Sequence, residues 1–209
     1  MMTEDEKEKF VSGIVRYGVP AIVVVDVVFL AVLIYGLLNR FSDTVIAILV
    51  AFSFVGYHAT YRALVGVVIG KFRPIFNLNS PLFIIDPMEM PLYDKLRVKD
   101  WKEKAPAWNM THFMLSMKDV RDINKVGRVV RYNISAEITH HCNFYLSLFG
   151  TLFCLFKGMQ QFWYVFAIVS LLIGIFGDVP FIMIQRYNRF RLLPLYLRLE
   201  EKSLKKKLL

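Results

Sequence analysis

Four stretches of apolar residues, separated by polar segments, dominate the hydrophobic pattern of this chain. A helix that crosses a bilayer needs about 20 mostly apolar residues. We therefore predict membrane spans at about residues 19–38, 45–70, 138–156 and 162–184. The link at 39–44 is short, which predicts an antiparallel hairpin of the first two helices. The pattern as a whole predicts an all-α integral membrane protein with four transmembrane helices.

The segment at about 71–134, between the second and third spans, follows a different pattern. Short apolar and basic stretches alternate there, and tryptophans lie among the basic residues. Five prolines, at 74, 81, 87, 91 and 106, exclude a long helix. We expect short amphipathic helices on the cytoplasmic side of the membrane. Residues 185–209 form a basic C-terminal tail, and no change in composition divides the chain, which we interpret as one membrane domain over 1–209.

Composition supports the membrane interpretation. The chain is 56% hydrophobic and 15% aromatic, with a mean hydropathy of +0.45, whereas soluble domains contain about 45–50% apolar residues. The net charge of +9 reflects membrane topology and contact with anionic lipid headgroups, so we expect lipid partners and no nucleic acid. The pattern makes no prediction about oligomeric state.

The distribution of lysine and arginine predicts the orientation of the spans. The N-terminal tail holds three of these residues, the 71–132 segment holds twelve, and the chain from Arg186 onward holds eight. The two short links hold one each, Arg40 and Lys157. Loops rich in lysine and arginine stay in the cytoplasm. We therefore expect a multi-pass plasma-membrane protein with both termini and the 71–134 segment in the cytoplasm.

Ionisable residues inside the predicted spans form a first group of candidate functional residues. Asp26 lies in the first span, and His58 and Arg62 lie one helical turn apart on the same face of the second. Such residues are costly in a membrane and face the bundle interior or a polar cavity. Two interpretations remain open: an ion pair between Asp26 and Arg62 that locks the hairpin, or a polar wall for a ligand.

A second group lies at the start of the third span, in ISAEITHHCNF. Helical spacing places Glu137, His140 and His141 on one face. A carboxylate beside an imidazole fixes its tautomer, as a general base requires. The alternative is an interfacial pair that only marks the membrane boundary. The chain has four histidines in all, too few for a multi-histidine centre, and we expect no metal.

A third group follows Asp178 and Pro180 at the cytoplasmic end of the fourth span. It comprises Gln185, Arg186, Tyr187, Asn188, Arg189 and Arg191. Arginine recognises phosphate or carboxylate through its planar fork of donors. Arginine and tyrosine also collect at the cytoplasmic end of any span. This run is denser than topology requires, which favours a binding function.

These groups carry a resemblance to a known family. QRYNRFRL, preceded by DVP, resembles the C-terminal signature of the glycosyl-diaponeurosporenoate acyltransferases, where the run reads NVP and then QRYNRPRL. AEITHH is similar to the family's AELIHW, which matches Glu137 and His140. VKDWKEKAP is similar to its basic Trp-Lys segment, which matches Trp101 and Lys102. The resemblance covers residues 89–192, and this chain departs from the family pattern at Asp178, Phe190 and His141.

The family comprises small membrane enzymes of bacterial carotenoid biosynthesis, so the resemblance implies transfer of a fatty acyl group to a hydroxyl of a glycolipid or isoprenoid-linked acceptor. We expect His140 to be the base, Glu137 to orient it, and His58 to be the second candidate base. The donor is expected to be acyl-CoA or an acyl carrier arriving from the cytoplasm, with no tightly bound cofactor. The residues expected to bind substrate or donor are Arg62, Trp101, Lys102, Gln185, Arg186, Tyr187, Asn188, Arg189 and Arg191.

Two alternatives to an acyltransferase remain open from the sequence. Other small membrane enzymes that modify lipids, of the reductase or methyltransferase type, also place Arg, Tyr and Asn beside a cytosolic cofactor. A non-catalytic membrane subunit would use the same charges for helix pairing and headgroup contact. Bound nicotinamide or adenosylmethionine would favour the first alternative, and bound CoA would favour the acyltransferase.

Overall fold

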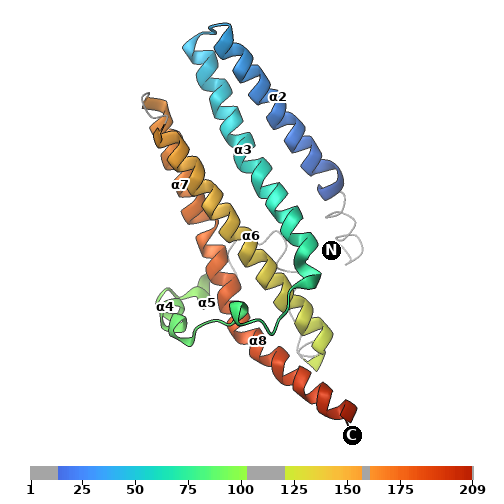
Figure 1. Cartoon of the computed structure of the whole chain (residues 1–209). Coiled ribbons are helices and arrows are strands. Elements are labelled where there is room, and N and C mark those ends of the chain that lie inside the picture. The colour runs from blue at the N-terminus through green and yellow to red at the C-terminus, as the bar shows by residue number, and fades with distance from the viewer. Residues whose placement is uncertain (1–13, 103–120, 157–160, 209) are drawn as a thin grey trace. The chain divides into compact units, whose positions relative to one another are not determined.

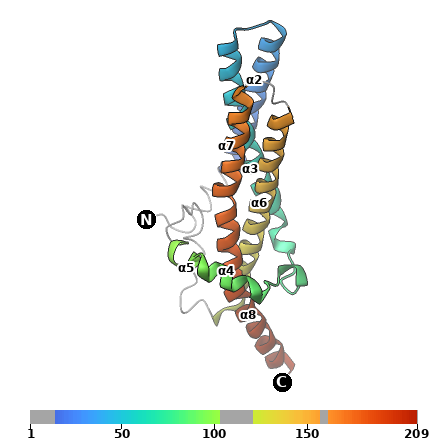
Figure 2. The ribbon, with the colours of Figure 1, turned by 90° about the vertical axis from the view of Figure 1, so that its left-hand side faces the viewer.

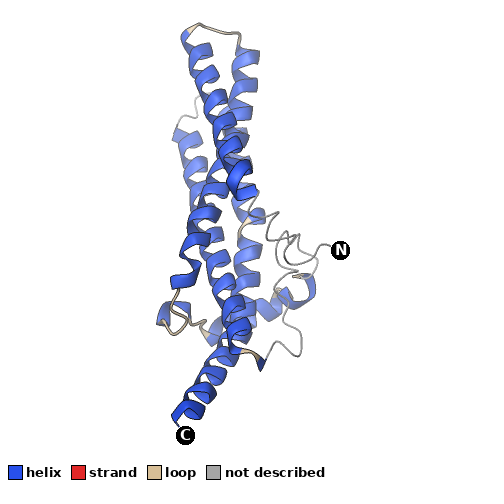
Figure 3. Ribbon diagram, turned by 90° about the vertical axis from the view of Figure 1, so that its right-hand side faces the viewer, coloured by secondary structure: helices blue, strands red, loops and turns tan. Residues whose placement is uncertain are grey.

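The computed structural model describes residues 14–102, 121–156 and 161–208, and these residues contain helices and no strands (Figure 3). Part of the predicted amphipathic segment, with Trp108, and the link at Lys157 lie outside the described residues. The chain divides into two compact units. Unit 1 comprises Met1–Val68 and Cys142–Phe176, and unit 2 comprises Ile69–His141 and Gly177–Leu209. Two helices, α3 (Asp43–Phe72) and α6 (Ile123–Phe156), contribute residues to both units.

Unit 1 begins with a short π-helix, Ile14–Gly18, followed by α2 (Val19–Leu38). The predicted hairpin is confirmed, because α2 and α3 lie side by side in Figures 1 and 2. The rings of Phe29 and Phe52 stack across this pair with centroids 5.0 Å apart. Asn39 ends α2 by donating its backbone N–H to the Tyr35 carbonyl at 3.0 Å. The remaining helices of unit 1 are the C-terminal part of α6 and α7 (Gln161–Gly177).

Among the described residues, three helical stretches are long and apolar enough to cross a membrane: Arg16–Leu38, Asp43–Ile75 and Trp163–Lys206. The apolar side chains of α2 are largely exposed; Val24, for example, retains 61% of its accessible surface. Exposed apolar helices of this length match a lipid environment. The predicted span at 138–156 is helical, but it is not apolar enough to be counted among these three stretches. Histidine, asparagine, serine and threonine side chains along this part of α6 lower its hydropathy.

Unit 2 contains short helices where the sequence predicts them. They are η2 (Arg73–Ile75), η3 (Pro81–Phe83), η4 (Pro87–Glu89), α4 (Met90–Lys95) and α5 (Val98–Trp101). Proline fits the first turn of a helix, where no N–H donor is needed, and four of these helices have one there. Asp86 caps η4 by accepting the Met88 N–H at 2.9 Å. Arg97 takes the left-handed conformation, φ 52°, between α4 and α5.

The two longest helices of unit 2 differ from their predicted boundaries. Helix α6 begins at Ile123, because the Asp122 side chain accepts the N–H groups of Asn124 and Lys125. It continues to Phe156 because no proline interrupts it. The predicted fourth span is interrupted: α7 ends at Gly177 and α8 runs over Val179–Leu208. Pro180 lacks the N–H that would continue the α7 ladder, and it fits the first turn of a new helix. The predicted C-terminal tail is therefore part of α8.

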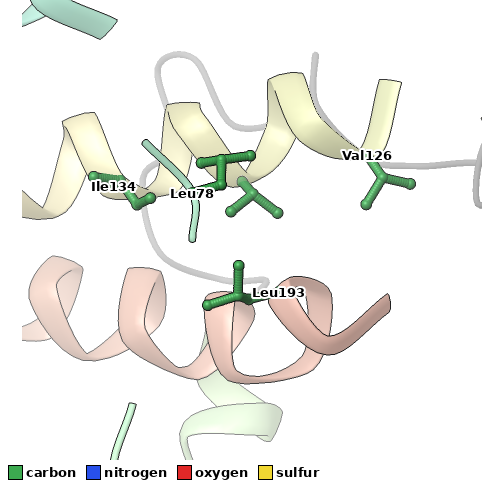
Figure 4. Packing of buried hydrophobic residues seen from close by; sticks show 5 residues of the cluster. Leu78, Val126, Ile134 and Leu193 are labelled. Atoms are coloured by element: carbon green, nitrogen blue, oxygen red, sulfur yellow. The ribbon is translucent and has the colours of Figure 1, made fainter. Parts of the chain in front are cut away.

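The hydrophobic core of unit 2 holds α6 against α8. Figure 4 shows Leu193 of α8 directed toward Leu78, Val126 and Ile134. Val126 and Ile134 are fully buried and eight residues apart on α6, a spacing that repeats one helix face. This packing fixes the rotation of both helices, and thereby the direction of their polar side chains.

Candidate functional site

The polar residues of unit 2 gather around the first turns of α8. Helices α4 and α5 both contact α8, and Figure 2 shows them lying across it. Consecutive residues of the QRYNR run point to different sides of this helix. Each of them therefore meets a different neighbouring segment.

Arg186 bridges two glutamates from different segments. Its Nε donates to Glu89 Oε2 at 2.9 Å, its Nη2 pairs with Glu89 Oε1, and its Nη1 donates to Glu137 Oε1 at 2.8 Å. Tyr93 also donates to Glu89 Oε2, at 2.6 Å. The hydrogen bond from Arg186 is the main cause of a lowered pKa at Glu89. Burial, followed by the Glu89 hydrogen bond, raises the pKa of Tyr93 to about 12, so Tyr93 remains a donor.

Glu137 is a buried acid shared by two arginines. Besides Arg186, it pairs through Oε2 with Arg189 Nη1, and both side chains are almost fully buried. His141 Nε2 lies 3.7 Å from Glu137 Oε1, a distance for a weaker ionic contact. The two arginines and the two glutamates, Glu89 and Glu137, balance in charge. This cluster therefore holds segments together and does not present unpaired cations.

His140 is paired with Asp178, whereas the sequence predicts Glu137 as its partner. His140 Nδ1 lies 3.0 Å from Asp178 Oδ1, and Asp178 is fully buried. An ionised Asp178 carboxylate accepts from Nδ1–H, and that tautomer leaves the Nε2 lone pair to accept a proton. The imidazole also stacks on Phe181, with ring centroids 4.9 Å apart and planes 10° apart. The His140 side chain is 23% exposed.

The second family segment docks on the other side of the QRYNR run. Lys102 Nζ donates to Asn188 Oδ1 at 3.0 Å and lies 5.0 Å from the centre of the Tyr187 ring. Trp101 packs on the buried cluster that contains Tyr187, and its Nε1 donates to the Leu96 carbonyl. Residues from the Trp-Lys, AEITHH and QRYNR segments thus lie in one unit. Helical spacing alone does not predict that arrangement.

His58 and Arg62 belong to unit 1, where they meet a different set of partners. His58 Nδ1 lies 2.8 Å from Tyr61 Oη, which in turn lies 2.7 Å from Ser147 Oγ. Arg62 Nη2 donates to the same Ser147 oxygen at 3.4 Å. His58 retains only 6% of its accessible surface. The group is a hydrogen-bonded network inside the bundle.

Asp26 contacts a glycine on the neighbouring helix. A Cβ added at Gly56 of α3 would lie 2.1 Å from Asp26 Oδ1. No ion pair joins the two described side chains of Asp26 and Arg62, so the predicted lock of the hairpin is absent. Because Gly56 has no side chain, helices α2 and α3 can approach each other closely here.

The structure adds three partners that the sequence analysis did not assign to the QRYNR run and His140. Glu89, Tyr93 and Asp178 complete the contacts of Arg186 and His140. A search for acids to balance the two arginines would have found Glu89, which lies in the apolar run MEMPLY. Gln185 is buried and Arg191 is exposed, so they do not share a surface. Within the described residues, no group of three or more His, Cys, Asp or Glu is arranged to hold a metal ion.

Comparison with known proteins agrees with this arrangement of segments. Neither the curated proteins nor the solved structures give a match to the chain. The family model described as glycosyl-4,4'-diaponeurosporenoate acyltransferase matches residues 79–198, which is more than half of the chain. The match includes the Trp-Lys, AEITHH and QRYNR segments, together with Glu89, Tyr93 and Asp178. The chain therefore belongs to the glycosyl-4,4'-diaponeurosporenoate acyltransferase family.

Proposed function

We propose that this protein is a membrane-embedded acyltransferase that moves a fatty acyl group from a cytoplasmic donor to a hydroxyl of a glycolipid or isoprenoid-linked acceptor. The observation that carries the proposal is the His140–Asp178 pair in the unit that holds the family's three motif segments. A half-buried imidazole held by a buried carboxylate has the form of a general base.

His140 is the proposed base, and Asp178 takes the orienting role that the sequence assigned to Glu137. Nε2 of His140 accepts the proton of the acceptor hydroxyl while that oxygen attacks the acyl carbonyl of a thioester donor. The new C–O bond replaces the C–S bond, and the proton passes from His140 to the departing thiolate. Asp178 holds the ring through Nδ1 during both proton transfers.

The proposed donor site is the partly exposed side of the motif cluster. Lys102 retains some exposure, and its charge suits the phosphates of acyl-CoA or an acyl carrier. Arg186 is also partly exposed, but its charge is balanced by Glu89 and Glu137. Arg189 is 2% exposed, so we assign it to the support of Glu137 and not to donor binding. The substitution Lys102→Gln removes the charge and tests this assignment. It should raise the KM for the donor more than it lowers kcat.

The proposal includes a plasma-membrane location with both termini in the cytoplasm. Three apolar helices and the family support membrane insertion. The excess of lysine and arginine in the tails and the central segment supports this orientation. We propose that the C-terminal part of α6 is the fourth crossing, packed in unit 1 so that its polar side chains face other helices and not lipid.

The decisive experiment compares two adjacent histidines. Membranes containing His140→Ala or His141→Ala are supplied with labelled acyl-CoA and lipid extract, and acylated lipid is measured. Loss of a positioned base lowers turnover by about 10²–10⁴-fold, so His140→Ala should lose transfer and His141→Ala should retain it. Equal activity of the two variants, with normal unfolding temperatures, would reject His140 as the base.

The variants of Asp178 separate chemistry from support. Asp178→Asn keeps an oxygen that accepts from Nδ1–H and matches the residue of the family pattern, so it should retain much of the activity. Asp178→Ala should lose a large part of the roughly 10²–10⁴-fold increase in turnover that the base contributes. A non-catalytic subunit would instead lose any phenotype only in proportion to its loss of stability.

A further inference from the structure

Arg73 lies where α3 ends, outside the cluster that carries the proposed chemistry. Helix α3 ends at Phe72, and the short helix η2 begins at Arg73. Pro74 restricts the backbone of the residue that precedes it. Leu78, a short way along the chain, is buried in the core of unit 2. The backbone is therefore fixed on both sides of Arg73, which gives its side chain a defined starting point.

Two side chains of α6 orient the Arg73 guanidinium. Its Nε donates to Ser135 Oγ at 3.2 Å, and its central carbon lies 4.7 Å from the centre of the Tyr132 ring. Ser135 is 3% exposed, and its spacing from Tyr132 places both partners on one face of α6. The hydrogen bond and the cation–π contact together hold the guanidinium in place. A surface arginine without such partners would keep its rotamer freedom.

The two terminal amino groups of Arg73 are left over from these contacts. Within the described residues, Arg73 forms no other hydrogen bond and no ion pair. Its side chain is half-buried. A guanidinium held at Nε presents Nη1 and Nη2 as a planar fork, which matches two oxygens of a phosphate. Arg186 differs in this respect, because its donors are taken by Glu89 and Glu137.

Positive charge continues along this part of α6. Arg128 lies four residues before Tyr132, and Arg131 lies four residues before Ser135. These spacings make each arginine a neighbour of one Arg73 partner on the helix surface. Neither arginine forms an ion pair in the part of the chain that the structure describes. The surroundings of Arg73 therefore attract an anion.

The length of α3 places Arg73 at the level of lipid headgroups. Helix α3 has 30 residues, which correspond to about 45 Å, and a bilayer with its headgroup regions is about 40–45 Å thick. The apolar stretch that contains this helix runs over Asp43–Ile75. A helix of this length that begins at one surface of the membrane ends among the headgroups of the other.

The apolar neighbours of Arg73 select a lipid as the source of the anion. Phe72 is 51% exposed and Ile75 is 73% exposed. A ligand that contacts these side chains and the guanidinium together needs both a charged headgroup and hydrocarbon chains. A phospholipid has both, and it is present in the membrane around the helix.

We propose that Arg73 binds the phosphate of an anionic phospholipid, with Ser135 and Tyr132 as the residues that orient its guanidinium. Phe72 and Ile75 contact the chains of the same lipid. The proposed site takes an individual lipid molecule, in contrast to the diffuse attraction of a basic surface. It is separate from the acyl-transfer chemistry and does not depend on it.

Native mass spectrometry of the full-length protein tests the site by counting bound lipids. Protein in detergent receives phosphatidylglycerol or phosphatidylcholine, and the dissociation constant of the first bound lipid is measured. The wild type should bind phosphatidylglycerol more tightly than phosphatidylcholine. Arg73→Gln should weaken phosphatidylglycerol binding by about 10–100-fold, because charge-assisted hydrogen bonds to the phosphate are lost.

Lys71 provides the matched control, because it is an exposed cation two residues before Arg73. Lys71→Gln removes the same charge without affecting the contacts to Tyr132 and Ser135, so binding should stay close to wild type. Arg73→Lys keeps the charge but lacks the planar fork, and it should bind nearly as weakly as Arg73→Gln. Ser135→Ala removes only the acceptor of Nε. It should weaken binding to a smaller extent, and it repeats the test if Arg73→Gln does not fold.

The outcomes separate a built lipid site from its alternatives. Equal weakening by Lys71→Gln and Arg73→Gln would show diffuse attraction and overturn the inference, as would unchanged affinity in Arg73→Gln, Arg73→Lys and Ser135→Ala. Excess coenzyme A should leave the bound lipid in place. Displacement of the lipid by coenzyme A would assign the fork to a soluble phosphate ligand and also overturn the inference. None of these results bears on acyl transfer, which the two histidine variants test separately.

Discussion

Unit 1 and unit 2 both bury polar side chains, but they satisfy them in different ways. In unit 1 the imidazole of His58 meets the hydroxyl of Tyr61, and Ser147 continues the chain of hydrogen bonds. In unit 2 the imidazole of His140 meets a carboxylate, and two arginines meet two glutamates. A hydroxyl network holds helices in register at small electrostatic cost, whereas opposed buried charges depend on one another. The two histidines thus suit different tasks, support in unit 1 and proton transfer in unit 2.

The largest effect should follow from removing the acid shared by the arginines. Glu137→Gln leaves Arg189 buried without its carboxylate, and breaking a buried pair in this way costs about 3–5 kcal/mol. The unfolding temperature of the purified protein should therefore fall strongly. Glu201→Gln breaks the exposed pair with Lys205 and should have little effect on stability, because water screens exposed ion pairs. Equal effects of the two variants would contradict the dependence of the buried charges of unit 2 on one another.

This prediction also changes how Glu137 is to be tested. A loss of activity in Glu137→Gln would follow from lost structure and would not identify a catalytic acid. Asp178 is the informative position, because its substitution acts on His140 directly.

The next effect concerns the close contact of α2 and α3 in unit 1. A Cβ at residue 56 meets Asp26 Oδ1 at 2.1 Å and Asp26 Cβ at 3.2 Å, so the Asp26 side chain must move or the two helices must separate. Overpacking of this kind costs about 1–3 kcal/mol. Gly66→Ala on the same helix meets nothing within 4 Å and should be neutral or slightly stabilising. Adding Asp26→Ala should recover most of the loss at Gly56→Ala, and failure to recover it would exclude this contact as the cause.

The predictability of the fold from sequence follows the strength of its local signals. Helix α2 has its predicted bounds, because a continuous apolar run ends at the polar link after Leu38. The break at Asp178 was only partly foreseen, since Pro180 is compatible with either a kink or a new helix start. Helix α6 extends beyond its predicted start because Asp122 caps it. A single cap gives a weak signal in a polar segment.

The candidate site was less predictable because its pairs join distant segments. Spacing places Glu137 near His140 on one helix. It does not reveal that Arg186 and Arg189 both pair with the Glu137 carboxylate. Arginine offers several donors and forms stronger charge-assisted bonds than a histidine. Asp178 follows α7 and reaches α6 only because the chain turns there. Packing of α6 against α8 decides these partners, and a single sequence contains little information about it.

A smaller effect should follow from removing one hydroxyl of unit 1. Tyr61→Phe deletes the group between His58 and Ser147 and should cost about 0.5–1.5 kcal/mol. Tyr164→Phe, at a half-exposed position on α7, is the matched control and should be neutral. Acyl transfer should survive in Tyr61→Phe. A severe loss of transfer at full stability would place proton transfer in unit 1 and reverse the comparison.

The smallest effect is a dependence of the stability of unit 2 on pH, which arises from Glu89. Its pKa is lowered in the folded protein, chiefly by Arg186, so near pH 4 the unfolded chain binds more protons at this position. The contribution of Glu89 is therefore complete at neutral pH and is lost as pH falls below the ordinary glutamate range. Hydrogen exchange of the α4 amides should accelerate in that range in the wild type. Glu89→Gln should exchange faster at neutral pH and change less on acidification, whereas Asp94→Asn, on the exposed side of α4, should follow the wild type. An α4 segment that responds to acid equally in Glu89→Gln would show that Arg186 does not hold it through Glu89.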